Sequence, residues 1–259
     1  DDAEGIVIKN WQGENELNQA YLTAIWGWRK PAYAEGVTSA WYDFQFLTDL
    51  LRALNQAVHD ADPSAITTTN LHTDIPAELS AAINLPSWLE AAALWRDDVD
   101  VMGFDAYPNY SFPDPINSGF IGERTKAIRE ATCGKNVILM EVGYPAGPAE
   151  LGFTEAKQAP FLRDAYDSGR AEGLVGYFHF KLSSTYQHDI EITPEDAQNY
   201  EMVNTLFTNA RLLPLSMWVV RNADYVADHY FDVVLTVEQY WGLMDTPGNH
   251  KPSWGVMED

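Results

Sequence analysis

The sequence predicts an α/β fold in which the strands of a parallel sheet alternate with helices. One observation is the order of the elements, because apolar strand-like runs and amphipathic helical stretches alternate along most of the chain. A second is their spacing, since strands expected to start near Ile6, Ile66, Val99, Val137 and Val175 are separated as in repeated βα units. A third is the length of 259 residues, which suits a single α/β barrel.

Four helices are expected between these strands. The longest spans residues 39–60, where apolar residues recur at helical spacing, Ser39 caps the start and Pro63 stops the helix. Pro86 lies near the first turn of the next helix, over residues 85–98. The other two expected helices cover residues 122–133 and 155–173.

Each expected strand is apolar along its length and turns polar at its carboxyl end. The strands cover residues 5–9, 65–72, 99–110, 136–145 and 174–184. Ligands bind at the carboxyl ends of the strands in parallel α/β folds, so the polar side chains there should converge. These side chains are Glu14, Asn15 and Glu16, then Asn70 and His72, Asp105 and Tyr107, Glu141, and finally His179 and Lys181.

Glu141 interrupts the apolar run VILMEVGYP and is therefore the leading functional candidate. A strand covered by helices is buried on both faces, and an unpaired carboxylate there costs free energy. A structural hydrogen bond is the alternative role, but local violations of this kind gather at functional sites. Two strands separate Glu141 from the strand before Glu16. In an eight-stranded barrel the fourth and seventh strands face each other, so these two carboxylates can flank a glycosidic bond.

The charge and composition exclude several classes of partner. The formal net charge is −22, from 38 acidic and 16 basic residues, so we expect neither nucleic acid nor an anionic membrane as a partner. No apolar run approaches the length of a membrane span, and we expect no signal peptide in this sequence. The single cysteine, Cys133, rules out an intramolecular disulfide and a cysteine-based metal site.

Several short motifs resemble those of the retaining β-glycosidases built on the TIM barrel, glycoside hydrolase clan A. WQGENELN resembles the Asn-Glu signature after strand four, and FDAYP resembles the sixth-strand segment. EVGYP resembles the seventh-strand motif, and GYFHF resembles the eighth strand. WGLMDTPGNHKPSW resembles the closing stretch of many members. The endo-β-galactanase and endo-β-1,3-glucanase families are most similar, and both stay open. The motifs occur at residues 11–18, 104–108, 141–145, 176–180 and 241–254.

The resemblance implies a (β/α)8 TIM barrel to which this chain supplies strands four to eight and an elaborated C-terminal segment. Residues 1–184 would form the C-terminal part of the catalytic barrel, and residues 185–259 a connection and closing segment of the same domain. Barrel strands one to three, with the arginine that supports the nucleophile, would be missing. We therefore expect a fragment, one piece of a nicked enzyme or a partial-barrel variant, completed by an upstream segment or a second chain.

The resemblance also assigns roles to individual residues. Glu16 would be the general acid/base and Glu141 the nucleophile. Glu14 points to the same face as Glu16 in an extended chain, so it is the alternative acid. Asn15 would bind the sugar 2-hydroxyl, or else serve as a turn residue. Tyr107 would orient Glu141, or else pack in the barrel.

Further sugar contacts are expected from residues around the strand ends. Phe180, itself a candidate substrate contact, stands where the clan usually has a tryptophan. Trp11, Tyr110 and Trp241 are therefore candidate stacking platforms in its place. His72 and His179 are candidate ligands of sugar hydroxyls, with a structural role as the alternative for each. Two strand-like runs, SMWVV and FDVVLTV, are expected in the long connection after residue 186. The acidic run EITPEDAQNYE is interpreted as a solvated face; it lacks the spacing of an EF-hand calcium loop.

The preferred interpretation is a retaining endo-β-glycanase that hydrolyses a polysaccharide by double displacement without a metal or organic cofactor. We expect it to act outside the cell or in the periplasm, because its substrates occur there. A non-catalytic carbohydrate-binding or interaction protein, derived from a truncated barrel, is the alternative. A metal-dependent hydrolase is a weaker one, because the six histidines are scattered and no His-x-His pair lies on a strand.

Overall fold

The chain divides into two compact units. The computed structural model describes residues 8–19, 43–82, 85–185, 190–209, 224–245 and 248–258, with a few positions between 211 and 222. Unit 1 comprises residues 1–106, 123–140 and 172–177, and unit 2 comprises residues 107–122, 141–171 and 178–259.

Unit 1 is built on a parallel five-stranded sheet whose strands follow one another in chain order. The register pairs Asn10 with Ile66, and His72 with Asp105. The last residues of the fourth and fifth strands belong to unit 2. The predicted α/β class and the later four strands are confirmed, while a complete eight-stranded barrel stays a prediction. The strands are β1 (Asn10–Gln12), β2 (Ile66–His72), β3 (Val101–Ala106), β4 (Val137–Val142) and β5 (Leu174–His179).

The first strand differs from the prediction in position and in burial. A buried strand was expected at residues 5–9, but β1 occupies Asn10–Gln12, and all three of its residues are exposed. Residues 5–7 lie outside the described part of the chain. β1 stands at one end of the strand order, and an edge strand covered on one side keeps its side chains in contact with solvent.

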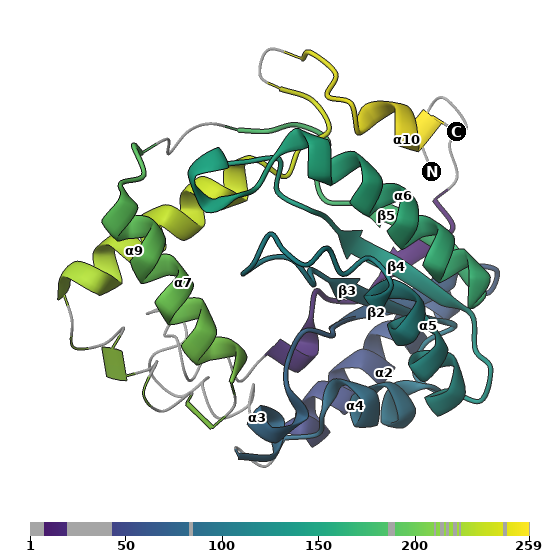
Figure 1. Ribbon diagram of the computed structural model, residues 1–259. Helices are drawn as coiled ribbons and strands as arrows, with labels where there is room; N and C mark the ends of the chain where they lie inside the picture. Colours follow the sequence, from purple (N-terminus) through teal and green to yellow (C-terminus); the bar gives the residue numbers. More distant parts are fainter. Residues whose placement is uncertain are drawn as a thin grey trace. The chain divides into compact units, whose positions relative to one another are not determined.

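Helices α2, α4 and α5 lie along the same side of strands β2 and β3 (Figure 1). Asp43 caps α2 with hydrogen bonds to the backbone N–H groups of Gln45 and Phe46, so the predicted cap at Ser39 is wrong. Ser87 caps α4 in a reciprocal capping box with Glu90, and Pro86 directly precedes this cap, close to the first turn. The helices of this part are α2 (Phe44–Ala61), α3 (Ala77–Ala82), α4 (Trp88–Trp95) and α5 (Phe120–Ala131).

The core of unit 1 lies between these helices and the sheet. Its side chains come from helices at every third or fourth residue and from alternating or consecutive strand positions, as expected for a helix-covered parallel sheet. Deeply buried apolar side chains of this layer come from α2, α4, β2 and β3. They include Leu47, Leu51, Leu71, Trp95, Met102 and Phe104, none of which exposes more than 1% of its surface.

Unit 2 contains helices where one strand had been predicted. The run FDVVLTV lies inside α9, with Tyr230, Val233 and Val237 buried at helical spacing, so its prediction as a strand is wrong. SMWVV lies largely outside the described residues. The acidic run opens α7 with a capping box between Thr193 and Asp196. The helices are α6 (Glu155–Ala171), α7 (Pro194–Thr208), α9 (Asp224–Gln239) and α10 (Trp254–Glu258). α7 packs against α9, and α6 against α10 (Figure 1).

No helix among the described residues combines the length and the apolar character that crossing a membrane requires. The division at residue 184 into a barrel part and a closing segment stays a prediction.

Candidate active site

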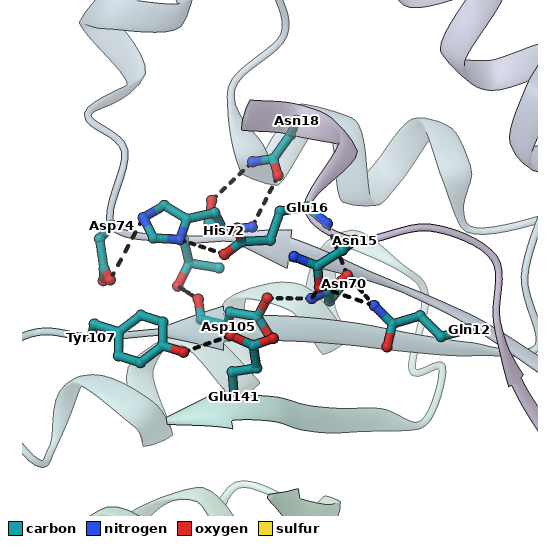
Figure 2. A network of polar contacts seen from close by, with 11 residues as sticks. Gln12, Asn15, Glu16, Asn18, Asn70, His72, Asp74, Asp105, Tyr107 and Glu141 are labelled. Carbon is teal, nitrogen blue, oxygen red and sulfur yellow. Dashed lines mark hydrogen bonds and ion pairs between the residues drawn. The ribbon is translucent and has the colours of Figure 1, made fainter. Parts of the chain in front are cut away.

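Asn70 organises the polar residues at the strand ends of unit 1 (Figure 2). Its side chain is fully buried on β2. The Asn70 Oδ1 atom accepts hydrogen bonds from the Glu16 backbone N–H at 2.9 Å and from the Gln12 side chain at 2.7 Å. Its Nδ2 group donates to Asn15 Oδ1 at 2.8 Å and to the Asp105 carboxylate. One buried amide therefore fixes the segment after β1 against β2 and β3, as the predicted convergence of strand ends requires.

The Glu16 side chain is held by His72. The Nδ1 atom of His72 lies 2.8 Å from Glu16 Oε1, and both side chains are largely buried. The Glu16 backbone has φ of +50°, a left-handed conformation that an L-residue with a side chain adopts at a cost of about 1 kcal/mol. Such strain persists only where the surroundings fix it, and the bond from Glu16 N–H to Asn70 does so here.

Glu14 and Glu16 differ clearly in environment. Glu14 is exposed, and its carboxylate accepts a 3.2 Å hydrogen bond from the N–H of the neighbouring Asn15. Glu16 is the carboxylate that belongs to the network, which favours it as the functional residue of the pair. Trp11 exposes 45% of its surface, and Asn15 is also exposed, so both side chains are accessible to a ligand.

In unit 2, Tyr107 donates a 2.6 Å hydrogen bond to Glu141 Oε2. Tyr107 follows directly after β3, and Glu141 is the penultimate residue of β4 (Figure 2). The tyrosine ring is fixed edge-to-face by Trp241, with centroids 5.0 Å apart, and by Phe180 at 6.0 Å. The hydrogen bond expected between Tyr107 and Glu141 is therefore present. A phenol donor favours the charged form of a carboxylate.

Three residues that were predicted to contact sugar are partly or fully buried and contact other residues of the protein. Trp241 is fully buried and stacks against Tyr110, so its environment is that of a packing residue. The Nε2 atom of His179 donates to the Trp241 carbonyl at 2.9 Å, and burial lowers the pKa of His179 to about 4. Phe180 is half-buried against Trp241. The sugar-binding roles of Trp241, His179 and Phe180 stay predictions.

A second carboxylate in unit 2, Glu238, was not predicted. It lies on α9 and accepts a 2.6 Å hydrogen bond from the Tyr110 hydroxyl. Burial raises the pKa of Glu238, with a further contribution from Glu141, while the bond from Tyr110 and the charge of Lys181 oppose it. Burial also raises the pKa of Tyr110 well above its ordinary value. No sequence signal marks Glu238, because its segment resembles a strand and its partner lies 128 residues away.

No role was predicted for Asn18 or Asp74 either. Asn18 donates from Nδ2 to the His72 carbonyl and accepts the His72 N–H, both at 2.9 Å. Asp74 Oδ2 lies 4.0 Å from His72 Nε2. Asn18 belongs to the motif WQGENELN, and that position was its only signal.

Comparison with known proteins gives only distant structural matches. No protein-family model matches the chain, and no curated protein matches it. The solved structures that resemble it include glycoside hydrolases. A glycoside hydrolase family 17 β-1,3-glucanosyltransferase from Rhizomucor miehei has 13% identity and a TM-score of 0.48, over 82% of this chain and 57% of that one. A GH2 β-galacturonidase from Eisenbergiella tayi has 12% identity and a TM-score of 0.48, over 96% of this chain and 38% of that one.

An exo-β-1,4-mannosidase, Op5Man5 from Opitutaceae bacterium strain TAV5, has 14% identity and a TM-score of 0.45. The match covers 83% of this chain and 32% of the mannosidase. The chain thus spans about a third to somewhat over half of the length of these proteins. Because the identities and TM-scores are this low, a function for this chain has to rest on its own residues.

Proposed function

We propose that this chain carries the two catalytic carboxylates of a retaining glycoside hydrolase, with Glu16 as general acid/base and Glu141 as nucleophile. The hydrogen bond from Tyr107 to Glu141 carries the proposal. A carboxylate inside a buried strand is costly unless it is paired, and the 2.6 Å phenol bond pairs it and fixes one of its oxygens. The motif resemblance assigns this pairing to a tyrosine and a nucleophile, and the bond joins those two residues.

The order of the strands supports the same assignment. β1 precedes Glu16, β4 carries Glu141, and two strands lie between them in the sheet. That separation equals the one between strands four and seven of an eight-stranded barrel. A further support is the environment of Glu16, whose half-buried carboxyl group lies against an imidazole rather than in open solvent.

The proposed reaction has two displacement steps. A Glu141 oxygen attacks the anomeric carbon, the glycosidic C–O bond breaks, and the departing oxygen takes the proton of Glu16. In the second step water gives a proton to the Glu16 carboxylate and its oxygen bonds to the anomeric carbon, which releases Glu141. A β-linked polysaccharide, met outside the cell or in the periplasm, is the proposed substrate. No metal or organic cofactor takes part in either step.

Release of reducing sugar from a panel of β-glycans tests the proposal. The panel comprises galactan, 1,3-glucan, 1,4-glucan, mannan and xylan, and the variants are Glu141→Gln and Glu150→Gln. Glu150 is an exposed glutamate outside the candidate site, so its variant is the matched control. We expect release by the wild type and by Glu150→Gln but not by Glu141→Gln.

The alternative function makes a different prediction in the same experiment. A non-catalytic carbohydrate-binding protein would release nothing from any glycan, yet it would bind one of them with equal affinity in the wild type and in Glu141→Gln. Full hydrolysis by a folded Glu141→Gln variant would contradict the proposed nucleophile.

A further inference from the structure

His72 lies between two carboxylates of unit 1. Its Nδ1 atom is 2.8 Å from Glu16 Oε1, and its Nε2 atom is 4.0 Å from Asp74 Oδ2. Carboxylates only accept hydrogen bonds, and a neutral imidazole donates from one nitrogen alone. The 2.8 Å contact between His72 Nδ1 and Glu16 Oε1 therefore needs one proton, which either atom can carry. The pair is thus placed to exchange that proton.

The main chain fixes this contact from both sides. Asn18 pairs with the N–H and the carbonyl of His72 through two 2.9 Å hydrogen bonds. Asn70 holds the backbone N–H of Glu16 at 2.9 Å. Both residues are thus clamped at their backbones, and the 2.8 Å approach of the ring to the carboxyl group follows from the fold. The Nδ1 atom of His72 is therefore already bonded to Glu16 when a sugar hydroxyl approaches.

We propose that His72 is a positioning residue for Glu16, which fixes one oxygen of its carboxyl group and shares a single proton with it. The inference rests on the proposed function in that Glu16 is the acid/base. When Glu16 holds the proton, its O–H donates to the neutral Nδ1 atom. When that proton has passed to the departing sugar oxygen, a protonated Nδ1 donates to the carboxylate. This contact with Glu16 replaces the predicted contact of His72 with sugar hydroxyls.

The charges that face this pair come from four elements. Glu16 follows β1, Asp74 follows β2, and Asp105 on β3 is paired with His72 in the strand register. Arg124 on α5 interacts electrostatically with Asp74. Three negatively charged side chains therefore belong to the surroundings of the imidazole, and Arg124 partly offsets the charge of Asp74. Two groups this close titrate as a pair, with two apparent steps that belong to neither residue alone.

Two substitutions of His72 separate its two possible contributions. In His72→Asn, the side-chain amide occupies the position of Nδ1, so a donor to Glu16 remains but cannot ionise. In His72→Gln, the amide instead reaches the position of Nε2, next to Asp74, so the contact with Glu16 is lost. Both variants keep a polar side chain of similar size, and urea unfolding of each verifies the fold.

The first readout needs no substrate. The chain has six histidines, so the ring nitrogen signal of His72 can be assigned in an NMR pH titration by its loss in His72→Asn. We expect this signal to titrate in two steps in the wild type and in one step in Glu16→Gln. A single step that is the same in both proteins would overturn the proposal.

The second readout is the pH dependence of kcat/KM for hydrolysis. The imidazole holds the shared proton when Glu16 does not, so the pair should lose that proton at a higher pH than Glu16 alone would. The alkaline limb should therefore move to lower pH in His72→Asn, by about one unit. The maximal kcat of His72→Asn should stay within a few-fold of wild type, and that of His72→Gln should fall about 10- to 100-fold. An unchanged profile in both variants would overturn the proposal.

The two proposals fail in different ways. If the wild type hydrolyses no β-glycan, the proposed function fails, and the histidine titration alone decides whether His72 and Glu16 share a proton. If hydrolysis depends on Glu141 but the titration has one step, only the role of His72 fails.

Discussion

Replacing Tyr107 by phenylalanine removes one hydrogen bond from Glu141 and little else. The ring contacts with Trp241 at 5.0 Å, Phe180 at 6.0 Å and Tyr110 at 6.5 Å remain available to phenylalanine. A hydrogen bond to a charged group contributes about 1.5–3 kcal/mol, and each 1.4 kcal/mol is a factor of ten in rate. The largest effect is expected where charge develops on Glu141, which is the second step, in which Glu141 leaves the anomeric carbon.

We therefore expect kcat of Tyr107→Phe to fall roughly 10- to 100-fold. The glycosyl-enzyme intermediate should accumulate, and a pre-steady-state burst of the first product should appear. Loss of a donor to the charged form raises the pKa of the nucleophile, so the acid limb of the pH profile should move to higher pH by about one unit. Stopped-flow kinetics on an aryl β-glycoside, together with the pH dependence of kcat/KM, measures all three effects.

Tyr230→Phe is the matched control, because the Tyr230 hydroxyl on α9 donates a buried 2.9 Å hydrogen bond to Asn204 on α7. It should change the free energy of unfolding by about 1 kcal/mol and leave the kinetics unchanged. A folded Tyr107→Phe variant with kcat within threefold of wild type and an unshifted acid limb would refute the role of this bond.

Three further predictions concern stability. The pKa of His179 is lowered by burial to about 4, so the unfolded chain binds more protons below its ordinary pKa. The free energy of unfolding should therefore fall by about 3 kcal/mol between about pH 6.5 and 4 because of His179. His179→Gln keeps a donor to the Trp241 carbonyl but cannot take up a proton, so urea titrations of this variant should lack the contribution of His179 to the fall. In Gly143→Ala the new methyl group would overlap the Trp241 ring and the Phe180 carbonyl oxygen, so thermal unfolding should show a loss of stability of about 1–3 kcal/mol. The control is Gly119→Ala, which has no atom near its added methyl group and should change stability by less than about 0.5 kcal/mol. Above about pH 10 the unfolded chain loses tyrosine protons that the folded chain retains. The free energy of unfolding should therefore drop by up to about 1.4 kcal/mol per pH unit for each tyrosine whose pKa is raised by burial, as followed by tyrosinate absorbance. A free energy of unfolding that stays level to pH 11 would contradict these raised pKa values. These tyrosines are Tyr110, Tyr144, Tyr177, Tyr200 and Tyr230.

The strands from β2 to β5 could be predicted because each is a short run rich in apolar or β-branched residues between helix-length segments. β1 could not be placed, because its residues Asn10–Gln12 carry no apolar alternation and lie at the edge of the sheet. The run FDVVLTV was misassigned because β-branched residues favour strands locally. In the fold, Tyr230, Val233 and Val237 are buried on one face of α9, and this tertiary packing outweighs the local preference.

The candidate site was predictable where its signal is local. Glu141 violates the apolar pattern of its own strand, and Tyr107 ends the strand before it, so sequence position alone marks both. The contact between Glu16 and His72 joins residues 56 positions apart. The bond between Tyr110 and Glu238 spans 128 positions. Only the packing of the strand ends and of α9 creates these pairs, and no pattern within one segment encodes them.

Chemical rescue by azide tests the assignment of the two carboxylates most directly. Glu16→Ala and Glu141→Ala are each assayed on an activated aryl β-glycoside with and without sodium azide, and the sugar product is identified by NMR. In Glu16→Ala, azide should attack the covalent intermediate and yield a β-glycosyl azide. In Glu141→Ala, azide should occupy the place of the lost nucleophile and yield the α-glycosyl azide by a single inversion. Rescue with the opposite stereochemistry, or glycan hydrolysis by either folded variant at the wild-type rate without azide, would contradict the account.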